Sequence, residues 1–120
     1  MDYAYDDQNI FARILRGEIP NRTVFENEYA LAFEDIAAQA PVHVLVIPKG
    51  PYMSLDHFAS HASPEEQVGF FAAVAEVCRS QGLDAGFRAI ANTRGHAVQE
   101  VPHFHLHILG GRPLGPMLAG

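Results

Sequence analysis

Three histidines alternate with apolar residues in the segment HFHLHI, which spans residues 103–108. On a β-strand successive side chains point to opposite faces, so the three imidazoles are predicted to share one face and the apolar residues the other. Such a row of imidazoles can bind a metal ion, can form a merely polar strand face, or can carry out nucleophilic catalysis near neutral pH. The residues alone leave these three interpretations open.

As a metal site, the outer histidines His103 and His107 would converge on zinc or copper, with His43 or Asp35 as a further ligand. As a structural row, three successive histidines are a poor choice, because valine or threonine suits a strand better. The catalytic interpretation therefore leads. The middle residue, His105, would attack a phosphoryl centre, form a labile N–P bond and leave to water in a second step.

Length and charge limit the function classes. The chain has 120 residues, enough for one domain, and its net charge of −6 argues against binding nucleic acid polymers. A single cysteine, Cys78, excludes an internal disulfide and fits a reducing compartment. The N-terminal segment is acidic and polar, and no apolar run approaches the ~18 residues of a membrane span. We therefore expect a cytoplasmic protein without a membrane partner.

Two helices are predicted to support the histidine row. The first covers residues 10–15 and ends before Gly17 and Pro20. The second begins after a Ser63 cap and ends at Gly82. Its buried face is predicted from the helical spacing of Val68, Phe71, Ala72, Ala75 and Cys78. Three further histidines, His57, His61 and His96, lack a partner pattern and are expected on the surface.

Short β-prone runs between the helices predict an antiparallel sheet, and hence an α+β fold. The run VHVLVI at residues 42–47 is the most β-branched in the chain and is predicted to be a central strand. The other predicted strands cover residues 23–25, 30–33, 87–91 and 101–109, with a turn at 26–28 and a loop at 92–98.

The sequence resembles the histidine triad (HIT) family well beyond the alternating histidines. The matching segments are Ile10-Phe11 with Ile14, GEIP at 17–20, LAFEDI at 31–36, APVHVLVIPK at 40–49, Asn92 and QEVPH at 99–103. The resemblance covers about residues 9–115 of a single HIT domain spanning residues 1–120. The ending LGGRP at 109–113 is similar to the Hint branch, the nucleoside phosphoramidate hydrolases.

This resemblance implies a fold and an activity. The fold would be a HIT-like α+β fold, with a sheet of about five antiparallel strands and two helices, and the sheet would continue across a homodimer. The activity would be hydrolysis of a purine nucleoside 5′-phosphoramidate through a covalent nucleotidyl-histidine, releasing an AMP- or GMP-type nucleotide without metal or cofactor. The alternatives are hydrolysis of dinucleoside polyphosphates or adenylylated intermediates, and a nucleotide-binding adaptor with little turnover.

The resemblance also implies roles for particular residues. His105 would be the nucleophile and His107 would contact the phosphate, while His103 and His43 would complete the cluster and control its protonation. The implied nucleotide-binding residues are Asp35 and Ile36 at the ribose, Phe11, Ile14, Phe33 and Leu45 around the base, and Asn92, Val98, Gln99 and Glu100 near the phosphate and leaving group.

Two positions depart from the family pattern. Val98 stands where the family usually has a glycine before the glutamine, and Glu100 stands where animal Hint proteins have a serine. Because glycine permits close approach of the backbone to a phosphate, Val98 is expected to narrow or shift this loop. The Glu100 carboxylate is expected to change the preference for the leaving group. Backbone N–H groups near residues 99–101 are expected to donate to phosphate oxygens.

Overall fold

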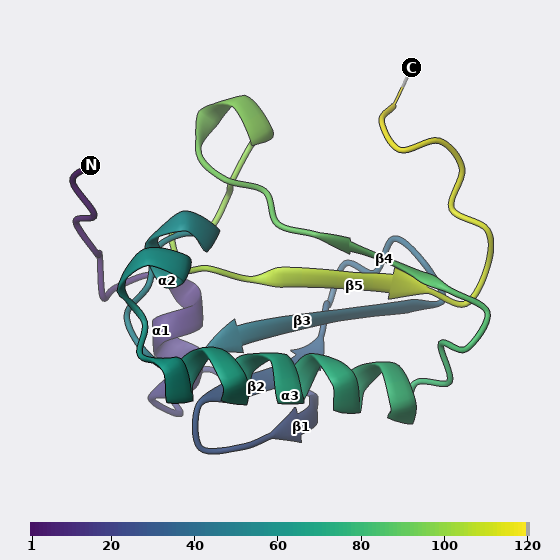
Figure 1. Ribbon diagram of the computed structural model, residues 1–120, viewed down its shortest axis with the longest axis horizontal. Helices are drawn as coiled ribbons and strands as arrows, with labels where there is room; N and C mark the ends of the chain where they lie inside the picture. The colour runs from purple at the N-terminus through teal and green to yellow at the C-terminus, as the bar shows by residue number, and fades with distance from the viewer. Residues whose placement is uncertain (120) are drawn as a thin grey trace.

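A five-stranded antiparallel sheet in the order β1-β2-β3-β5-β4 organises the molecule, with helices on both faces (Figure 1). The computed structural model describes residues 1–119. The α+β fold and its five-stranded antiparallel sheet are confirmed. The strands are β1 (Thr23–Glu26), β2 (Ala30–Glu34), β3 (Val42–Pro48), β4 (Phe87–Ile90) and β5 (Leu106–Gly110).

The middle strand β3 supplies both hydrophobic cores. Its Val44 and Val46 belong to the core beneath α3 (Pro64–Ser80), whereas its Leu45 and Ile47 belong to the core beneath α1 (Ile10–Leu15). A β-branched run with both faces covered suits this central position, as predicted. The register sets Leu45 opposite His107 of β5, which brings the histidine row beside the core under α1.

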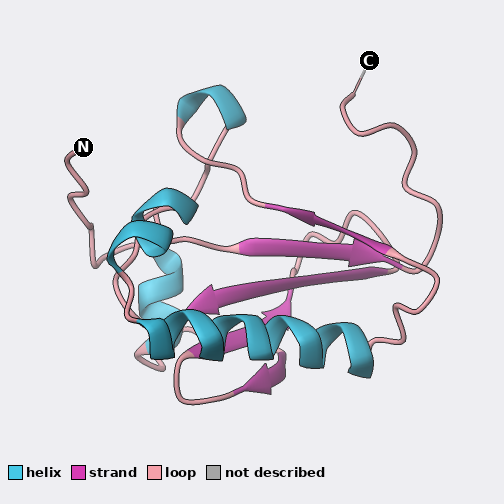
Figure 2. Ribbon diagram, in the orientation of Figure 1, coloured by secondary structure: helices cyan, strands magenta, loops and turns pink. Residues whose placement is uncertain are grey.

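The structure contains a third α-helix, α2 (Leu55–His61), that was not predicted. Ser54 caps it through a hydrogen bond from the His57 backbone N–H to the Ser54 hydroxyl. Figure 2 shows that α3 runs across the sheet and that α2 lies beside its first turn. The prediction that His57 lies on the surface is wrong, since its ring is buried and stacks on Tyr3.

The predicted buried face of α3 is wrong except for Cys78, which packs against the core, and the predicted capping box is confirmed. Phe70, Ala73 and Val77 point into the core, whereas Val68 is 71% and Phe71 58% exposed. The helix carries apolar residues around most of its circumference, so two overlapping stripes have helical spacing. The sheet covers one stripe and leaves the other on the surface of this chain.

The last strand begins five residues later than predicted, at Leu106 instead of Val101. Before it, the backbone turns: the His103 N–H bonds to the Val101 carbonyl, and the Phe104 N–H bonds to the Tyr52 carbonyl. The alternation of side chains nevertheless continues through the turn, because Phe104 and Ile108 both enter the core under α3. Within residues 1–119, no helix has the length and apolar character needed to cross a membrane.

Candidate active site

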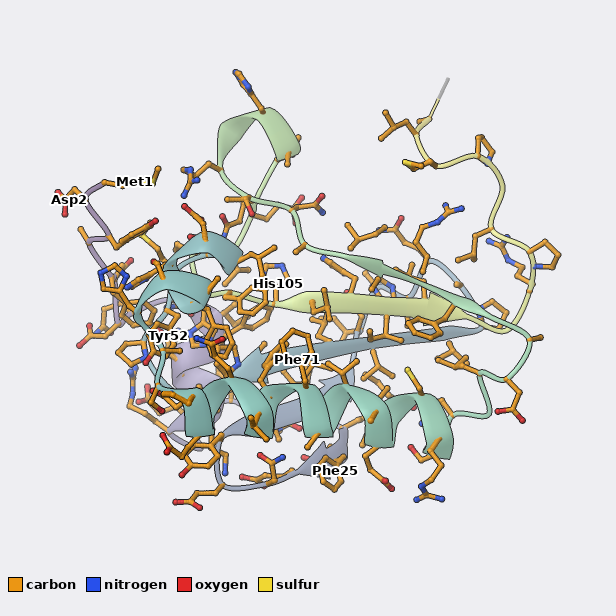
Figure 3. All side chains as sticks on the ribbon, in the orientation of Figure 1. Met1, Asp2, Phe25, Tyr52, Phe71 and His105 are labelled. Atoms are coloured by element: carbon orange, nitrogen blue, oxygen red, sulfur yellow. The ribbon has the colours of Figure 1, made fainter. Side chains whose placement is uncertain are left out.

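His107 lies in β5, and His103 and His105 lie in the turn before it. Figure 3 shows His105 at the start of this strand. The rings of the three histidines are on the side of the sheet that α1 covers. Phe11 of α1 packs edge-on against the ring of His105, with 5.0 Å between ring centroids, and His105 in turn lies 5.1 Å from His107. The turn and the strand therefore bring two imidazoles to one cavity, with a third behind them.

The protonation of His105 is set by a backbone carbonyl. Its Nδ1 lies 2.7 Å from the carbonyl oxygen of His103, and a carbonyl can only accept a hydrogen bond. Nδ1 therefore carries the proton and donates it, which leaves a lone pair on Nε2. Burial lowers the pKa of His105, so the ring is neutral at pH 7. A neutral imidazole with a free Nε2 is a competent nucleophile.

The neighbouring His107 has the opposite tautomer, and His43 determines it. The backbone N–H of Gln39 donates to Nδ1 of His43, so His43 carries its proton on Nε2. That proton is donated to Nδ1 of His107 across 2.9 Å. His107 therefore carries its own proton on Nε2, where it can serve as a hydrogen-bond donor. Burial and the neighbouring histidines lower the pKa of His107 to about 4.

His103 lies behind the other two and is fully buried. Its Nε2 is 2.8 Å from the Pro48 carbonyl oxygen and therefore donates to it. Its Nδ1 is 2.6 Å from the Tyr5 hydroxyl. Burial lowers its pKa to about 4. Both ring nitrogens are thus occupied within the protein, and His103 acts by holding the backbone that His105 contacts.

A cavity of about 490 Å³ opens in front of His105 and His107. All the predicted site residues line this cavity except His103 and His43, which lie behind its wall. Phe11 and Phe33 pack edge to face at its apolar end, with Ile14 and Leu45 beside them. Ile36 is at the mouth and fully exposed. The remaining predicted lining residues are Asp35, Asn92, Val98, Gln99 and Glu100.

A sequence model described as the HIT domain matches residues 16–114 of this chain. The chain belongs to the HIT domain family. It is 53% identical over 119 residues to a 13.2 kDa HIT-like protein of Azospirillum brasilense, covering 98% of each chain. It is 42% identical to the purine nucleoside phosphoramidase of Escherichia coli K12 over 94% of this chain and 95% of that one.

Solved structures agree with the HIT assignment. A histidine triad protein from Clostridium difficile superposes with a TM-score of 0.81 at 34% identity, covering 96% of this chain and all of the other. The fold of this chain is therefore that of a HIT domain.

Gln99 of this HIT domain braces its own loop. Its side-chain nitrogen donates to the carbonyls of Met53 and Val101, and its side-chain oxygen accepts from the Arg94 N–H. Its backbone N–H donates to the Arg94 carbonyl. Of the backbone N–H groups near residues 99–101 that are expected to donate to phosphate, that of Gln99 is already used within the loop, and for Glu100 and Val101 this role stays a prediction.

Two residues of the same loop adopt positive φ angles without being glycine. Arg94 has φ 55° and is fixed by two hydrogen bonds to Asp56. Val98 has φ 55° and ψ 52°, the left-handed conformation that suits the glycine common in the family. The valine side chain is largely exposed at the cavity rim. The backbone at Val98 is therefore strained, because a valine stands where the family usually has a glycine.

The structure contradicts the metal site that the sequence predicted from His103 and His107. His103 and His107 do not converge, since both nitrogens of His103 are bound to Pro48 and Tyr5. Among residues 1–119, the group whose ligand atoms lie close enough for one ion is Asp35, His43 and His107, within 4.8 Å of one another. The hydrogen bond between His43 and His107 already joins two of these ligand atoms.

Several site residues were missed in the sequence. Tyr5 contacts His103 from 98 positions away, and no local pattern indicates such a contact. Residues 19–22, which follow α1, form another part of the cavity wall. The GEIP motif at 17–20 could have pointed to them, since it belongs to the family resemblance.

The depressed histidine pKa values predict a pH dependence of stability. In the unfolded chain the imidazoles of His103 and His107 have the ordinary histidine pKa of 6.5, whereas in the folded protein burial lowers both pKa values to about 4. The free energy of unfolding should therefore fall as the pH drops from about 6.5 towards 4, by up to about 1.4 kcal/mol per pH unit for each group. Urea denaturation at a series of pH values measures this. His107→Gln should flatten the slope and the exposed-site control His96→Gln should not; equal slopes in all three proteins would contradict the prediction.

The strain at Val98 predicts that Val98→Gly stabilises the protein. Glycine adopts the left-handed conformation without the steric strain of valine. The loss of this strain should outweigh the greater conformational freedom of glycine in the unfolded chain and raise the free energy of unfolding by up to about 1 kcal/mol. Ala97→Gly is the matched control, because Ala97 does not have a positive φ, and it should lower stability. Chemical denaturation compares the two, and a loss of stability in both variants would show that Val98 is unstrained.

Proposed function

We propose that the protein hydrolyses purine nucleoside 5′-phosphoramidates through a nucleotidyl intermediate on His105. The observation that carries this proposal is the free Nε2 of His105 at the cavity, with Nδ1 committed to the His103 carbonyl. The Escherichia coli relative at 42% identity is a purine nucleoside phosphoramidase, and membership of the HIT family supports a hydrolase in general.

In the first step, the Nε2 lone pair of His105 forms an N–P bond to the α-phosphorus as the P–N bond to the amine breaks. The amine leaves with the bonding electrons and takes a proton from solvent at the open mouth. The ring then bears a positive charge, which the His103 carbonyl oxygen stabilises from 2.7 Å. In the second step, water attacks phosphorus, the electrons of the N–P bond return to Nε2, and a proton is released with the nucleotide.

His107 contributes electrostatic stabilisation in this scheme. Its Nε2–H would donate to a non-bridging phosphate oxygen, which gains charge in the transition state. Because His43 donates to the other nitrogen of His107, the Nε2 proton cannot move to the wrong side of the ring without breaking that bond. A neutral donor also suits the low pKa of His107.

The rest of the cavity fits a nucleoside. The apolar end, between Phe11 and Phe33, would hold the base by stacking and burial. Asp35 would accept from ribose hydroxyls through the remaining lone pairs of its carboxylate, whose Oδ1 accepts from the Ala37 N–H and whose Oδ2 lies 3.4 Å from His43 Nε2. Glu100 lies at the rim, where the leaving amine would depart, and a carboxylate there favours a cationic amine over an anionic group.

The proposal is tested by comparing turnover of adenosine 5′-phosphoramidate and diadenosine triphosphate. The phosphoramidate should be strongly preferred, and His105→Ala should lower its kcat/KM by about a thousandfold or more. Intact-mass spectrometry after an acid quench should reveal a nucleotidyl adduct that maps to His105. His96→Gln, which changes an exposed histidine outside the cavity, serves as the control.

Three outcomes would contradict this function. A preference for diadenosine triphosphate would favour a dinucleoside polyphosphate hydrolase. Binding of AMP without turnover of either compound would favour a nucleotide-binding adaptor. Unchanged hydrolysis in His105→Ala would remove the histidine nucleophile altogether.

We also propose that the protein works as a homodimer. Strand β4 is an edge strand, which leaves its outer backbone groups without a neighbouring strand in this chain. Phe87 on β4 and the uncovered stripe of α3, including Val68 and Phe71, are exposed apolar groups. Pairing of β4 with its copy would continue the sheet and cover this surface.

The homodimer predicts a specific effect of charge on α3. Phe71→Asp should convert a dimer into a monomer in light scattering coupled to size-exclusion chromatography, because it places a carboxylate in an apolar interface. Leu55→Asp alters a similarly exposed apolar residue on α2 and should leave the dimer intact. A monomeric wild-type protein at micromolar concentration would contradict the proposal.

A further inference from the structure

We propose that Tyr5 is a positioning residue of the active site, which acts through His103 to fix the tautomer and orientation of the nucleophile His105. The inference rests on the proposed function for its kinetic consequence, but the contact itself stands on geometry. The Tyr5 hydroxyl lies 2.6 Å from Nδ1 of His103, and the two rings pack edge to face.

The direction of this hydrogen bond follows from the other side of the His103 ring. Nε2 donates to the Pro48 carbonyl, so Nδ1 of the neutral ring has a lone pair and needs a donor. His103 is fully buried and excluded from water. Among residues 1–119, the partner found at Nδ1 is the Tyr5 hydroxyl, which must therefore donate.

Asn9 directs the Tyr5 proton toward His103. The side-chain nitrogen of Asn9 donates to the Tyr5 oxygen across 3.0 Å and to the Asp6 carbonyl across 2.7 Å. The side-chain oxygen of Asn9 caps α1 by accepting the Ala12 N–H. Because the Tyr5 oxygen already accepts from Asn9, its own proton points at His103. The N-terminal cap of α1 thus continues into the histidine cluster.

The consequence for His105 is geometric. Hydrogen bonds at both ring nitrogens clamp His103 between Pro48 and Tyr5, and the carbonyl of this same residue accepts the Nδ1–H of His105. Loss of the Tyr5 donor would let His103 change tautomer or rotate, and its carbonyl would then hold His105 less firmly. Small displacements of a nucleophile reduce the rate of the chemical step more than the binding of substrate.

The N-terminal segment that carries Tyr5 is anchored independently. Tyr3 stacks on His57 with 4.4 Å between ring centroids, and its hydroxyl donates to Asp56. The HIT domain match begins at residue 16, so Tyr3, Tyr5 and Asn9 lie outside the matched region.

The first test replaces the Tyr5 hydroxyl alone. NMR of protein with ¹⁵N-labelled histidine distinguishes a ring nitrogen that carries a proton from one that does not. In wild-type protein His103 should be protonated on Nε2 only, and in Tyr5→Phe its signals should shift toward a mixture of tautomers. For adenosine 5′-phosphoramidate, kcat should fall roughly tenfold while KM changes less than about twofold.

Tyr52→Phe is the matched control. It also removes a partly buried tyrosine hydroxyl, but that hydroxyl bonds to Glu66, outside the cavity. It should leave the His103 signals and kcat unchanged. An equal loss of kcat in Tyr52→Phe would overturn the proposal, because general destabilisation would then explain both variants.

The second test keeps Tyr5 and replaces the hydrogen-bond donor that Asn9 offers to its hydroxyl with an acceptor. Asn9→Asp retains a side-chain oxygen that can cap α1 but replaces the donor to Tyr5 with an acceptor, which should draw the Tyr5 proton away from His103. It should reproduce the His103 shift seen in Tyr5→Phe. If both variants keep the wild-type His103 signals and kcat, the proposal is overturned. If wild-type protein does not turn over the phosphoramidate, the proposed function fails, while the NMR comparison still decides the role of Tyr5.

Discussion

The hydrogen bond from His105 Nδ1 to the His103 carbonyl is the interaction on which the site depends. It fixes which nitrogen of the nucleophile is free, and it places a negative dipole beside the ring that becomes cationic during attack. The bond requires the backbone at residues 103–105 to leave strand pairing, so that a carbonyl can turn toward a side chain two residues later. Phe104, buried in the opposite core, anchors this turn.

Backbone groups set the remaining tautomers as well. The Gln39 N–H orients His43, which orients His107, and the Pro48 carbonyl orients His103. Pro48 ends β3, where every residue after Val42 is buried, and Gln39 lies in the exposed turn before this strand. Backbone groups in β3 and in the turn before it therefore determine these tautomers, whereas the strained loop with Arg94 and Val98 supplies part of the cavity rim.

The sequence predicted the strands and the shared face of the histidines better than the contacts between residues that are distant in the chain. The period-two alternation at 103–108 was sufficient to place imidazoles and apolar residues on opposite faces, because that consequence is local. The buried face of α3 was not predictable, since two apolar stripes compete and only the sheet selects Phe70 over Phe71. The contact of Tyr5 with His103 and the bracing of Gln99 depend on tertiary hydrogen bonds, which leave no periodic signal in the chain.

The account is tested most directly by the protonation pattern of the histidines in the free wild-type protein at neutral pH, measured from their ring ¹⁵N shifts. His105 should be neutral with its proton on Nδ1, whereas His103 and His107 should be neutral with theirs on Nε2. A proton on Nε2 of His105, or a doubly protonated His105 ring, would contradict the account, because the nitrogen that faces the cavity would then have no lone pair for phosphorus.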